Sequence, residues 1–245
     1  MPKVDKSQYT KSQWKRIKEQ RRRQKALERS RKAIVEHQII RNPNSKIAFV
    51  IGNGTSRQGI ELASLNSLGP VYACNAVYRT YQPDYLIAVD TKMVLEIAKA
   101  GYQLKNEVWT NYNKTYEKLR GFNYFEPSLG WSSGPTALNL ASEHGYETIY
   151  ILGFDYKGTS NDKVNNIFAD TPNYKKSTDK ATYFGNWLRQ TGIVIQKNPK
   201  IRYIRVLGEN EFIPEPFSKL PNIEHISMSE FLKIVKKDSF EPIST

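Results

Sequence analysis

Short apolar runs alternate with polar, glycine-containing segments from position 47 to the C-terminal part of the chain. Six of these runs have the length and the β-branched or aromatic content of buried strands: 47–51, 71–74, 85–89, 107–110, 148–152 and 201–207. Five segments carry the apolar spacing of helices: 58–65, 91–100, 133–144, 179–196 and 229–236. The alternation predicts an α/β fold of the Rossmann-like kind, in which helices cover both faces of a mostly parallel sheet.

The first strand leads into a turn rich in glycine, Gly52-Asn53-Gly54-Thr55-Ser56. Glycines at the end of a buried strand let backbone N–H groups approach a phosphate or nucleotide closely. The turn matches neither the full dinucleotide fingerprint nor a Walker loop, because no Gly-Lys-Ser/Thr sequence follows it. An ordinary strand-to-helix turn, with Thr55 or Ser56 as the helix N-cap, is an equal alternative.

Other polar residues and glycines also follow predicted strands or open the helix at 133. They are Asn75, Asp90, Ser132, Ser133, Gly134, Asp155 and Tyr156. Open parallel sheets bind ligands outside the carboxyl ends of their strands, and helix N-termini suit phosphates, so these positions predict a nucleotide-containing ligand. Asp90 and Asp155 could orient a ribose, hold a metal or act as a base, whereas capping the next helix is the alternative for Asp90.

Together these motifs resemble the small bacterial sialyltransferases that use a CMP-sugar donor, and the related hydroxymethylpterin-pyrophosphokinase-like domains. The resemblance covers about residues 46–210 and depends on the order and spacing of the motifs. It implies a GT-A-like form of the sheet and a CMP-sugar type of donor. It further implies that the donor nucleotide is contacted by Asn53, Gly54, Ser56, Asn75, Ser132, Ser133 and Gly134. By the same resemblance, Tyr156 helps to bind the donor phosphate.

Residues 157–178 are polar and form a longer stretch than a simple connection needs. They predict either a lid over the site or a disordered surface insertion. The sialyltransferases place a histidine general base in this lid, whereas His37, His144 and His225 lie elsewhere. A different base, a different sugar or a lost activity would each account for this difference. Candidate bases are Asp155, Asp170 and Asp179, and Tyr174 or Lys175 is a candidate for stabilising the departing phosphate.

The net charge of +13 is concentrated at the N-terminus. Residues 1–41 hold 14 Lys and Arg against 4 Asp and Glu, which leaves 23 against 20 for the rest of the chain. No apolar residue lies within 18–25, so residues 1–41 predict a basic helical or disordered arm before a single α/β domain at 42–245. Nucleic acid is the expected partner, with another anionic partner or none as alternatives. The candidate contacts are Lys15, Arg16, Arg21, Arg22, Arg23 and Lys25.

The cysteine content, the hydropathy and the placement of histidines argue against a disulfide-stabilised protein, a membrane-spanning protein and a metal site. The single cysteine, Cys74, excludes an internal disulfide framework, and its place in an apolar run predicts a buried thiol. No apolar run approaches the ~20 residues of a membrane span, so a cytoplasmic protein is the default expectation. The histidines lack partners at ligand spacing and no Asp-x-Asp pair occurs, so we predict no metal site.

The sequence therefore favours a glycosyltransferase-like enzyme that takes a nucleotide sugar and modifies nucleic acid engaged by the basic arm. One alternative is a pyrophosphokinase-like phosphotransferase, which would need Mg²⁺ at Asp90 or Asp155. The other is a non-catalytic protein that binds nucleic acid or an assembly and keeps a vestigial pocket.

Overall fold

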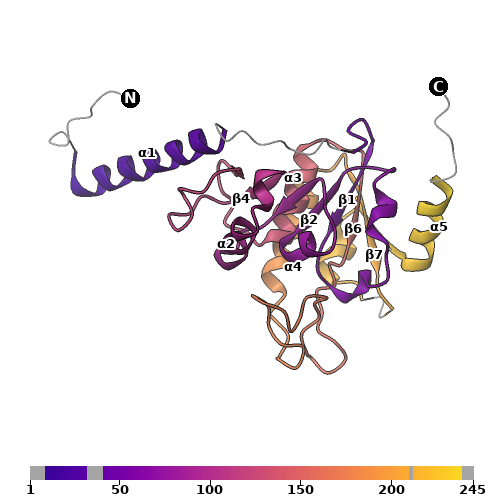
Figure 1. The fold of residues 1–245 in the computed structure, drawn as a ribbon. Coiled ribbons are helices and arrows are strands. Elements are labelled where there is room, and N and C mark those ends of the chain that lie inside the picture. The colour runs from indigo at the N-terminus through magenta and orange to yellow at the C-terminus, as the bar shows by residue number, and fades with distance from the viewer. Residues whose placement is uncertain (1–8, 32–40, 210–211, 239–245) are drawn as a thin grey trace.

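A computed structural model describes residues 9–31, 41–209 and 212–238 (Figure 1). These residues contain one sheet of eight strands, all parallel, in the order β5-β4-β3-β2-β1-β6-β7-β8. The strands are β1 (Ile47–Ile51), β2 (Val71–Cys74), β3 (Tyr85–Ile87), β4 (Val108–Thr110), β5 (Phe122–Tyr124), β6 (Thr148–Leu152), β7 (Arg202–Leu207) and β8 (Ile223–Ser227). The predicted Rossmann-like α/β sheet is confirmed, while its GT-A-like character stays a prediction.

Helices cover both faces of this sheet (Figure 1). The α-helices of the described residues are α1 (Lys11–Arg31), α2 (Thr91–Lys99), α3 (Ser133–Glu143), α4 (Gly185–Lys197) and α5 (Met228–Asp238). Alternate residues of β1 point to opposite faces: Ala48 and Val50 pack with residues of α3 and α4, while Phe49 and Ile51 pack with residues of α2 and α5. Burial on both faces explains why the central strands are continuous apolar runs.

Several elements differ from the sequence-based prediction. The pattern does not predict β5, which is three residues long, or β8, whose residues alternate between polar and apolar. The helix expected at 58–65 is replaced by two 3₁₀ turns, Thr55–Arg57 and Leu62–Leu65, separated at Gly59 with its positive φ of 86°. Helix α4 begins at Gly185 rather than 179, because residues 179–181 pair with the segment before them through the bonds from Val164 N to Asp179 O and from Ala181 N to Asp162 O.

Cys74 is buried, as its place in an apolar run predicts. Its Sγ lies 3.1 Å from Ile51 O, and burial raises the pKa of the thiol to about 12. A thiol with this pKa stays protonated at neutral pH and is a poor nucleophile. Within the described ranges, no helix has the length and apolar character that crossing a bilayer requires.

His225 on β8 is half-buried, and neither of its ring nitrogens has a hydrogen-bond partner within the described residues. Its ring stacks on Phe217 with centroids 6.3 Å apart. Burial, together with the charge of Arg205, lowers the pKa of His225 to about 4. Because an unfolded histidine titrates near pH 6.5, the folded state binds fewer protons between pH 6.5 and 4. The stability contribution of His225 is therefore complete above pH 6.5 and is lost as the pH falls through this window.

We expect His225→Phe to keep the stacking on Phe217 and to weaken the pH dependence of stability. The Tm of the wild type should fall more between about pH 7.5 and 5 than the Tm of the variant, because the variant has no imidazole to protonate on unfolding. Differential scanning calorimetry in matched buffers measures both differences. Equal decreases for the two proteins would contradict the assignment.

Candidate functional site

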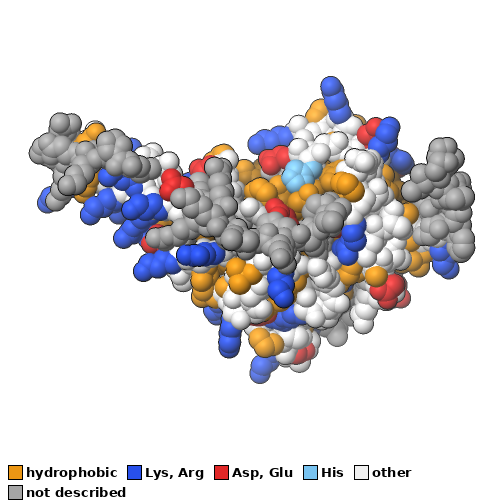
Figure 2. All heavy atoms as spheres, turned by 45° about the horizontal axis from the view of Figure 1, so that its top comes forward, with side chains coloured by type: hydrophobic (Ala, Val, Ile, Leu, Met, Phe, Trp, Pro, Cys, Tyr) orange, Lys and Arg blue, Asp and Glu red, His pale blue; other side chains and the backbone are white. Residues whose placement is uncertain are grey.

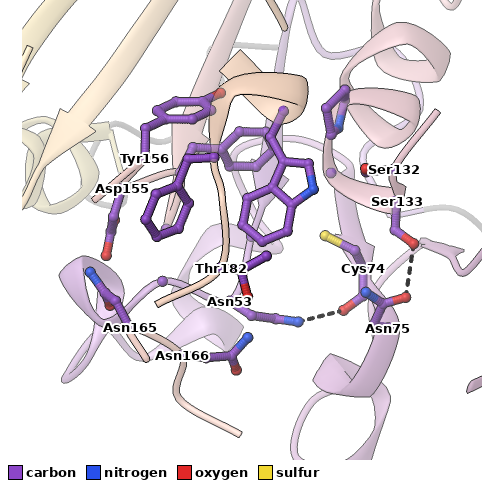
Figure 3. Close-up of a pocket in the computed structure, with 18 of the residues that line it drawn as sticks. Asn53, Cys74, Asn75, Ser132, Ser133, Asp155, Tyr156, Asn165, Asn166 and Thr182 are labelled. Carbon is purple, nitrogen blue, oxygen red and sulfur yellow. Dashed lines mark hydrogen bonds between the residues drawn. The ribbon is translucent and has the colours of Figure 1, made fainter. Parts of the chain in front are cut away.

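The carboxyl ends of β1, β2, β3 and β6 surround a cavity of about 250 Å³ (Figure 3). It lies beside β1 and β6, the neighbouring strands from which the chain order runs outward in opposite directions, and ligands of open α/β sheets bind at this switch point. Ten residues predicted from the sequence line it: Gly52, Asn53, Gly54, Asn75, Asp90, Ser132, Ser133, Gly134, Asp155 and Tyr156. Residues from distant parts of the chain thus meet at one edge of the sheet.

Gly52 and Gly54 are required by close packing of the turn against the segment after β6. A Cβ on Gly52 would lie 2.5 Å from Gly153 O, and one on Gly54 would lie 2.7 Å from Asp155 Oδ1. Real Cβ atoms do not approach other atoms so closely, so a side chain at position 52 would require the backbone to move, and one at position 54 would displace the Asp155 carboxylate. The turn therefore brings the ends of β1 and β6 together at the floor of the cavity.

The N–H groups of this turn are largely paired within the protein. The pairs are Gly52 N to Leu152 O (2.7 Å), Gly54 N to Gly153 O (2.9 Å), Thr55 N to Asn165 Oδ1 (2.9 Å) and Ser56 N to Asp155 Oδ2 (3.1 Å). Thr55 and Ser56 line a neighbouring cavity instead of this one. The turn shapes the floor, but these four N–H groups already have acceptors, which differs from the phosphate cradle that the sequence predicts.

The first turn of α3 offers donors that have no partner. Ser132 occupies the N-cap position, one residue before the expected Ser133, and its hydroxyl makes no capping bond. The Ser133 hydroxyl donates to Asn75 Oδ1 at 2.9 Å (Figure 3) and accepts from Val89 N at 3.1 Å. These two bonds fasten the helix start to the segments that follow β2 and β3. The backbone N–H groups of Ser133 and Gly134 make no hydrogen bond within the described residues. The positive end of α3 therefore faces the cavity with free N–H groups.

Asp90 is a carboxylate of this cavity without a hydrogen-bond partner among the described residues. It occupies the N-cap position of α2, yet its side chain makes no capping bond, so the capping alternative is not realised. Asp90 is exposed at the cavity, but the surrounding protein removes enough water from its carboxylate to raise its pKa. A carboxylate with a raised pKa in a cavity is suited to accept a proton.

The other predicted carboxylates are engaged elsewhere. Both oxygens of Asp155 accept hydrogen bonds from Ser56, from its N–H and from its hydroxyl, so this carboxylate fastens the turn after β1. Asp170 and Asp179 are exposed and do not line the cavity. Asp170 Oδ1 accepts from a backbone N–H at 3.0 Å and Asp179 Oδ2 from another at 2.9 Å, within local turns. The structure therefore does not bring these two candidates to the site.

The two predicted tyrosines have hydroxyls that the protein already uses. Tyr156 is 8% exposed, and its hydroxyl donates to Thr191 Oγ1 at 2.7 Å. The hydroxyl of Tyr174 accepts from Asn53 Nδ2 at 3.2 Å and from Ala76 N at 3.3 Å. Burial raises the pKa of both phenols. Tyr174 thus joins the lid segment to the turn after β1.

The segment 157–178 lies against the site. Ile167 N donates to Asn53 O at 2.8 Å, and Asn165 Oδ1 accepts from the hydroxyl of Thr55 at 2.6 Å. Farther along, Arg79 donates to Thr171 Oγ1 at 2.8 Å. Four residues of the segment line the cavity: Lys157, Val164, Asn165 and Asn166. This segment therefore forms one wall of the cavity, as a lid would.

Aromatic side chains form another part of the wall, which the sequence pattern does not predict. Phe154, Phe184 and Trp187 line the cavity, and the rings of Phe184 and Trp187 lie 5.5 Å apart, edge to face. Phe154 lies two residues after the end of β6, directly after Gly153, which is a usable signal. Trp187 shows no such signal, because its place depends on where α4 begins.

Two buried arginines beneath the cavity were also missed. Arg57 is 6% exposed, and its Nε donates to Gly52 O at 2.6 Å. Arg205 is 3% exposed, and its Nε donates to Phe154 O at 2.8 Å. Burial lowers the pKa of both guanidinium groups. Each arginine holds the backbone just after a central strand, so both act as supports of the cavity floor.

The six predicted nucleic-acid contacts lie on α1, apart from the cavity. Lys15, Arg16, Arg22 and Lys25 are exposed. Arg21 and Arg23 are half-buried. Arg23 forms an ion pair with Glu126, with Nε and Oε2 2.5 Å apart. Of the six cations, Arg23 is therefore turned toward the protein, while four are exposed.

In comparisons with known proteins, no family model, curated protein or solved structure matches the chain. The resemblance to CMP-sugar sialyltransferases and pyrophosphokinase-like domains therefore stays a prediction from the motifs. Across the described residues, no cluster of three or more His, Cys, Asp and Glu side chains is arranged to hold a metal ion. His37 lies outside the described residues.

Proposed function

We propose that the protein is a glycosyltransferase-like enzyme that binds a nucleotide sugar in this cavity and transfers the sugar to an acceptor hydroxyl. The observation that carries the proposal is the meeting of three features at the switch point of the sheet. These are the free N–H groups at the start of α3, an aromatic wall, and the unpartnered Asp90. Each feature suits a different part of one donor and its acceptor.

In this proposal the aromatic wall stacks on the base of the donor, since every nucleobase offers a π-face. The N–H groups of Ser133 and Gly134, together with Lys157, stabilise the negative charge of the departing phosphate. Asp90 takes the proton of the acceptor hydroxyl. The acceptor oxygen then forms a bond to the anomeric carbon of the sugar, the bond from that carbon to the phosphate oxygen breaks, and the nucleotide leaves with both electrons of that bond.

We propose nucleic acid as the acceptor, because the cations of residues 1–41 accompany a domain that is close to neutral. Transfer is tested by incubating the protein with CMP-, UDP- and GDP-sugars and hydroxymethylated DNA, followed by mass spectrometry of the nucleosides. Added mass of one sugar supports the proposal. No added mass with any donor contradicts it.

Trp187→Ala should weaken nucleotide binding. Loss of one stacked aromatic ring costs about 1–3 kcal/mol, which corresponds to a rise in Kd of roughly 5- to 150-fold. Tyr183→Ala is the matched control, because Tyr183 is 78% exposed, lies four residues earlier and does not line the cavity. Isothermal titration with the nucleotide that gives the largest thermal shift measures both variants. Equal affinities for the two variants would show that the aromatic wall does not hold the base.

The two alternative functions give different outcomes in the same assays. ATP binding that requires Mg²⁺ and is lost in Asp90→Asn would favour the phosphotransferase. The absence of a histidine among the described residues that line the cavity favours the non-catalytic protein. For that alternative, no nucleotide would shift the Tm although nucleic acid still binds.

A further inference from the structure

Helix α1 presents a row of cations on one face. Lys11, Lys15, Lys18, Arg22 and Lys25 follow one another at spacings of four, three, four and three residues, which places them on one side of an α-helix. All five side chains are exposed, and Figure 2 shows Lys and Arg side chains gathered along this helix. At a rise of 1.5 Å per residue the row is roughly 21 Å long.

A second face of α1 fastens the helix to the domain. Arg23 pairs with Glu126 at 2.5 Å, and Glu19 Oε2 lies 3.0 Å from Lys114 Nζ. Ala26 is fully buried within the core cluster that contains β5 residues. Glu19, Arg23 and Ala26 are spaced by four and three residues and therefore share a face. The cation row lies on the adjoining face, so docking of the helix leaves the row exposed.

Helix α1 contacts the domain at Phe125 and Glu126, on the side of the sheet where the carboxyl ends of the strands and the cavity lie. Arg23 Nη2 donates to Phe125 O at 3.3 Å, and Phe125 directly follows β5. All strands are parallel, so the carboxyl end of β5 lies on the same side of the sheet as the carboxyl ends of β1, β2, β3 and β6. From Glu126 the chain leads within six residues to Ser132, in the wall of the cavity. A polymer bound along α1 would therefore lie on the side of the sheet where the carboxyl ends of the strands form the cavity.

We propose that this cation row binds the phosphates of duplex nucleic acid. Regularly spaced lysines and arginines neutralise a regularly charged backbone without reading its sequence. Lys118 and Arg120 are also exposed, on the same connection between β4 and β5 as Lys114, which pairs with Glu19 of α1. The row contains no carboxylate, and the nearby Trp14 and Ile17 are half-buried, whereas a helix that lies in a membrane interface needs an exposed apolar face to insert. The claim that this nucleic acid is the acceptor of the sugar rests on the proposed function. Binding of nucleic acid to the cation row requires neither a sugar donor nor sugar transfer.

The proposal revises the contacts predicted from the sequence. Lys15, Arg22 and Lys25 belong to the row. Arg16 is exposed but points more than a quarter turn away from the row, by the geometry of the helix. Arg23 holds α1 against the domain through Glu126 and is an anchor instead of a phosphate contact.

The test compares Lys15→Ala with Arg16→Ala in the full chain, by fluorescence anisotropy of a labelled DNA duplex of mixed sequence. The two variants remove one exposed cation each from neighbouring positions of the same helix, and alanine preserves the helix. We expect Lys15→Ala to reduce the slope of log K against log salt by about 0.9 and Arg16→Ala to leave it nearly unchanged. The double variant Lys15→Ala/Arg22→Ala should lose about twice that slope.

Circular dichroism confirms that α1 is retained, and a Tm equal to that of the wild type confirms that the domain is intact. Equal effects of Lys15→Ala and Arg16→Ala, or no DNA binding by the wild type, would overturn the proposal. Tighter binding to vesicles with phosphatidylserine, or to a poly-glutamate peptide, would also overturn it. Because no nucleotide sugar is present, a failed transferase assay and a failed binding assay are independent results.

Discussion

Asp90→Asn is expected to lower kcat for sugar transfer by about 10²- to 10⁴-fold, which is the usual contribution of a general base. The variant keeps the size of the side chain but cannot take a proton from the acceptor. Asp90 and Asp155 both line the cavity. Asp155 accepts a hydrogen bond from Ser56, whereas the side chain of Asp90 has no hydrogen bond to a described residue. The nucleotide Kd, measured separately by calorimetry, should change little, because the N–H groups of α3 and the aromatic wall remain.

The same variant is expected to be more stable than the wild type at neutral pH. Loss of hydration raises the pKa of Asp90 in the folded state above that of the unfolded chain, so the folded state binds more protons between the two values. Stability therefore falls as the pH rises through this window, and the loss is complete above the folded pKa. The amide of the variant does not ionise, so Tm should rise at pH 7 and match the wild type near pH 3.

Asp155→Asn is the matched comparison for this pair of effects. Its carboxylate accepts two hydrogen bonds from Ser56, and an amide can accept at one oxygen only. We expect this variant to lower Tm at neutral pH, the opposite of Asp90→Asn. If Asp90→Asn also lowers Tm, or abolishes nucleotide binding, then Asp90 supports the structure and is not the base.

The central part of the fold follows from its apolar runs. β1, β2 and β6 lie where the runs at 47–51, 71–74 and 148–152 predict them, because a strand buried on both faces has few alternatives. β8 is an edge strand, and its residues Glu224 and His225 break the apolar run. The start of α4 depends on bonds between residues 162–164 and 179–181. Neither hydropathy nor local propensity reports such contacts.

The sequence predicts where the site lies in the fold, but it does not predict which of the site's hydrogen-bonding groups pair with one another. A parallel sheet requires Asn53, Asn75 and Asp90 to meet at one edge, and in the structure they line one cavity. Which N–H groups of the turn stay free is decided by Asp155 and Asn165, which come 99 and 110 residues after their partners. A single sequence shows the donors and the acceptors but does not pair them. The expected phosphate site therefore moves from the turn after β1 to the start of α3.

Gly52→Ala is expected to destabilise the protein by about 1–3 kcal/mol, as overpacking of a closed site does, and to weaken nucleotide binding. The new Cβ would lie 2.5 Å from Gly153 O and 2.8 Å from Phe154 Cδ2. The first of these atoms belongs to the backbone after β6 and can move only if the ladder between β1 and β6 is distorted. The second belongs to a ring that lines the cavity, so relief of the clash displaces the aromatic wall. Urea unfolding and nucleotide titration measure the two effects.

Gly192→Ala separates this clash from the general effect of replacing a glycine. Gly192 lies within α4, and a Cβ there would meet no atom within 4 Å. Alanine should stabilise this helix by about 0.5–1 kcal/mol, since glycine loses more conformational freedom on folding. The new methyl group is free of contacts at Gly192 and clashes at Gly52, so the two variants should shift stability in opposite directions. A Gly52→Ala protein as stable as the wild type would mean that the backbone after β1 does not pack closely against the backbone after β6. The described floor of the cavity would then be wrong.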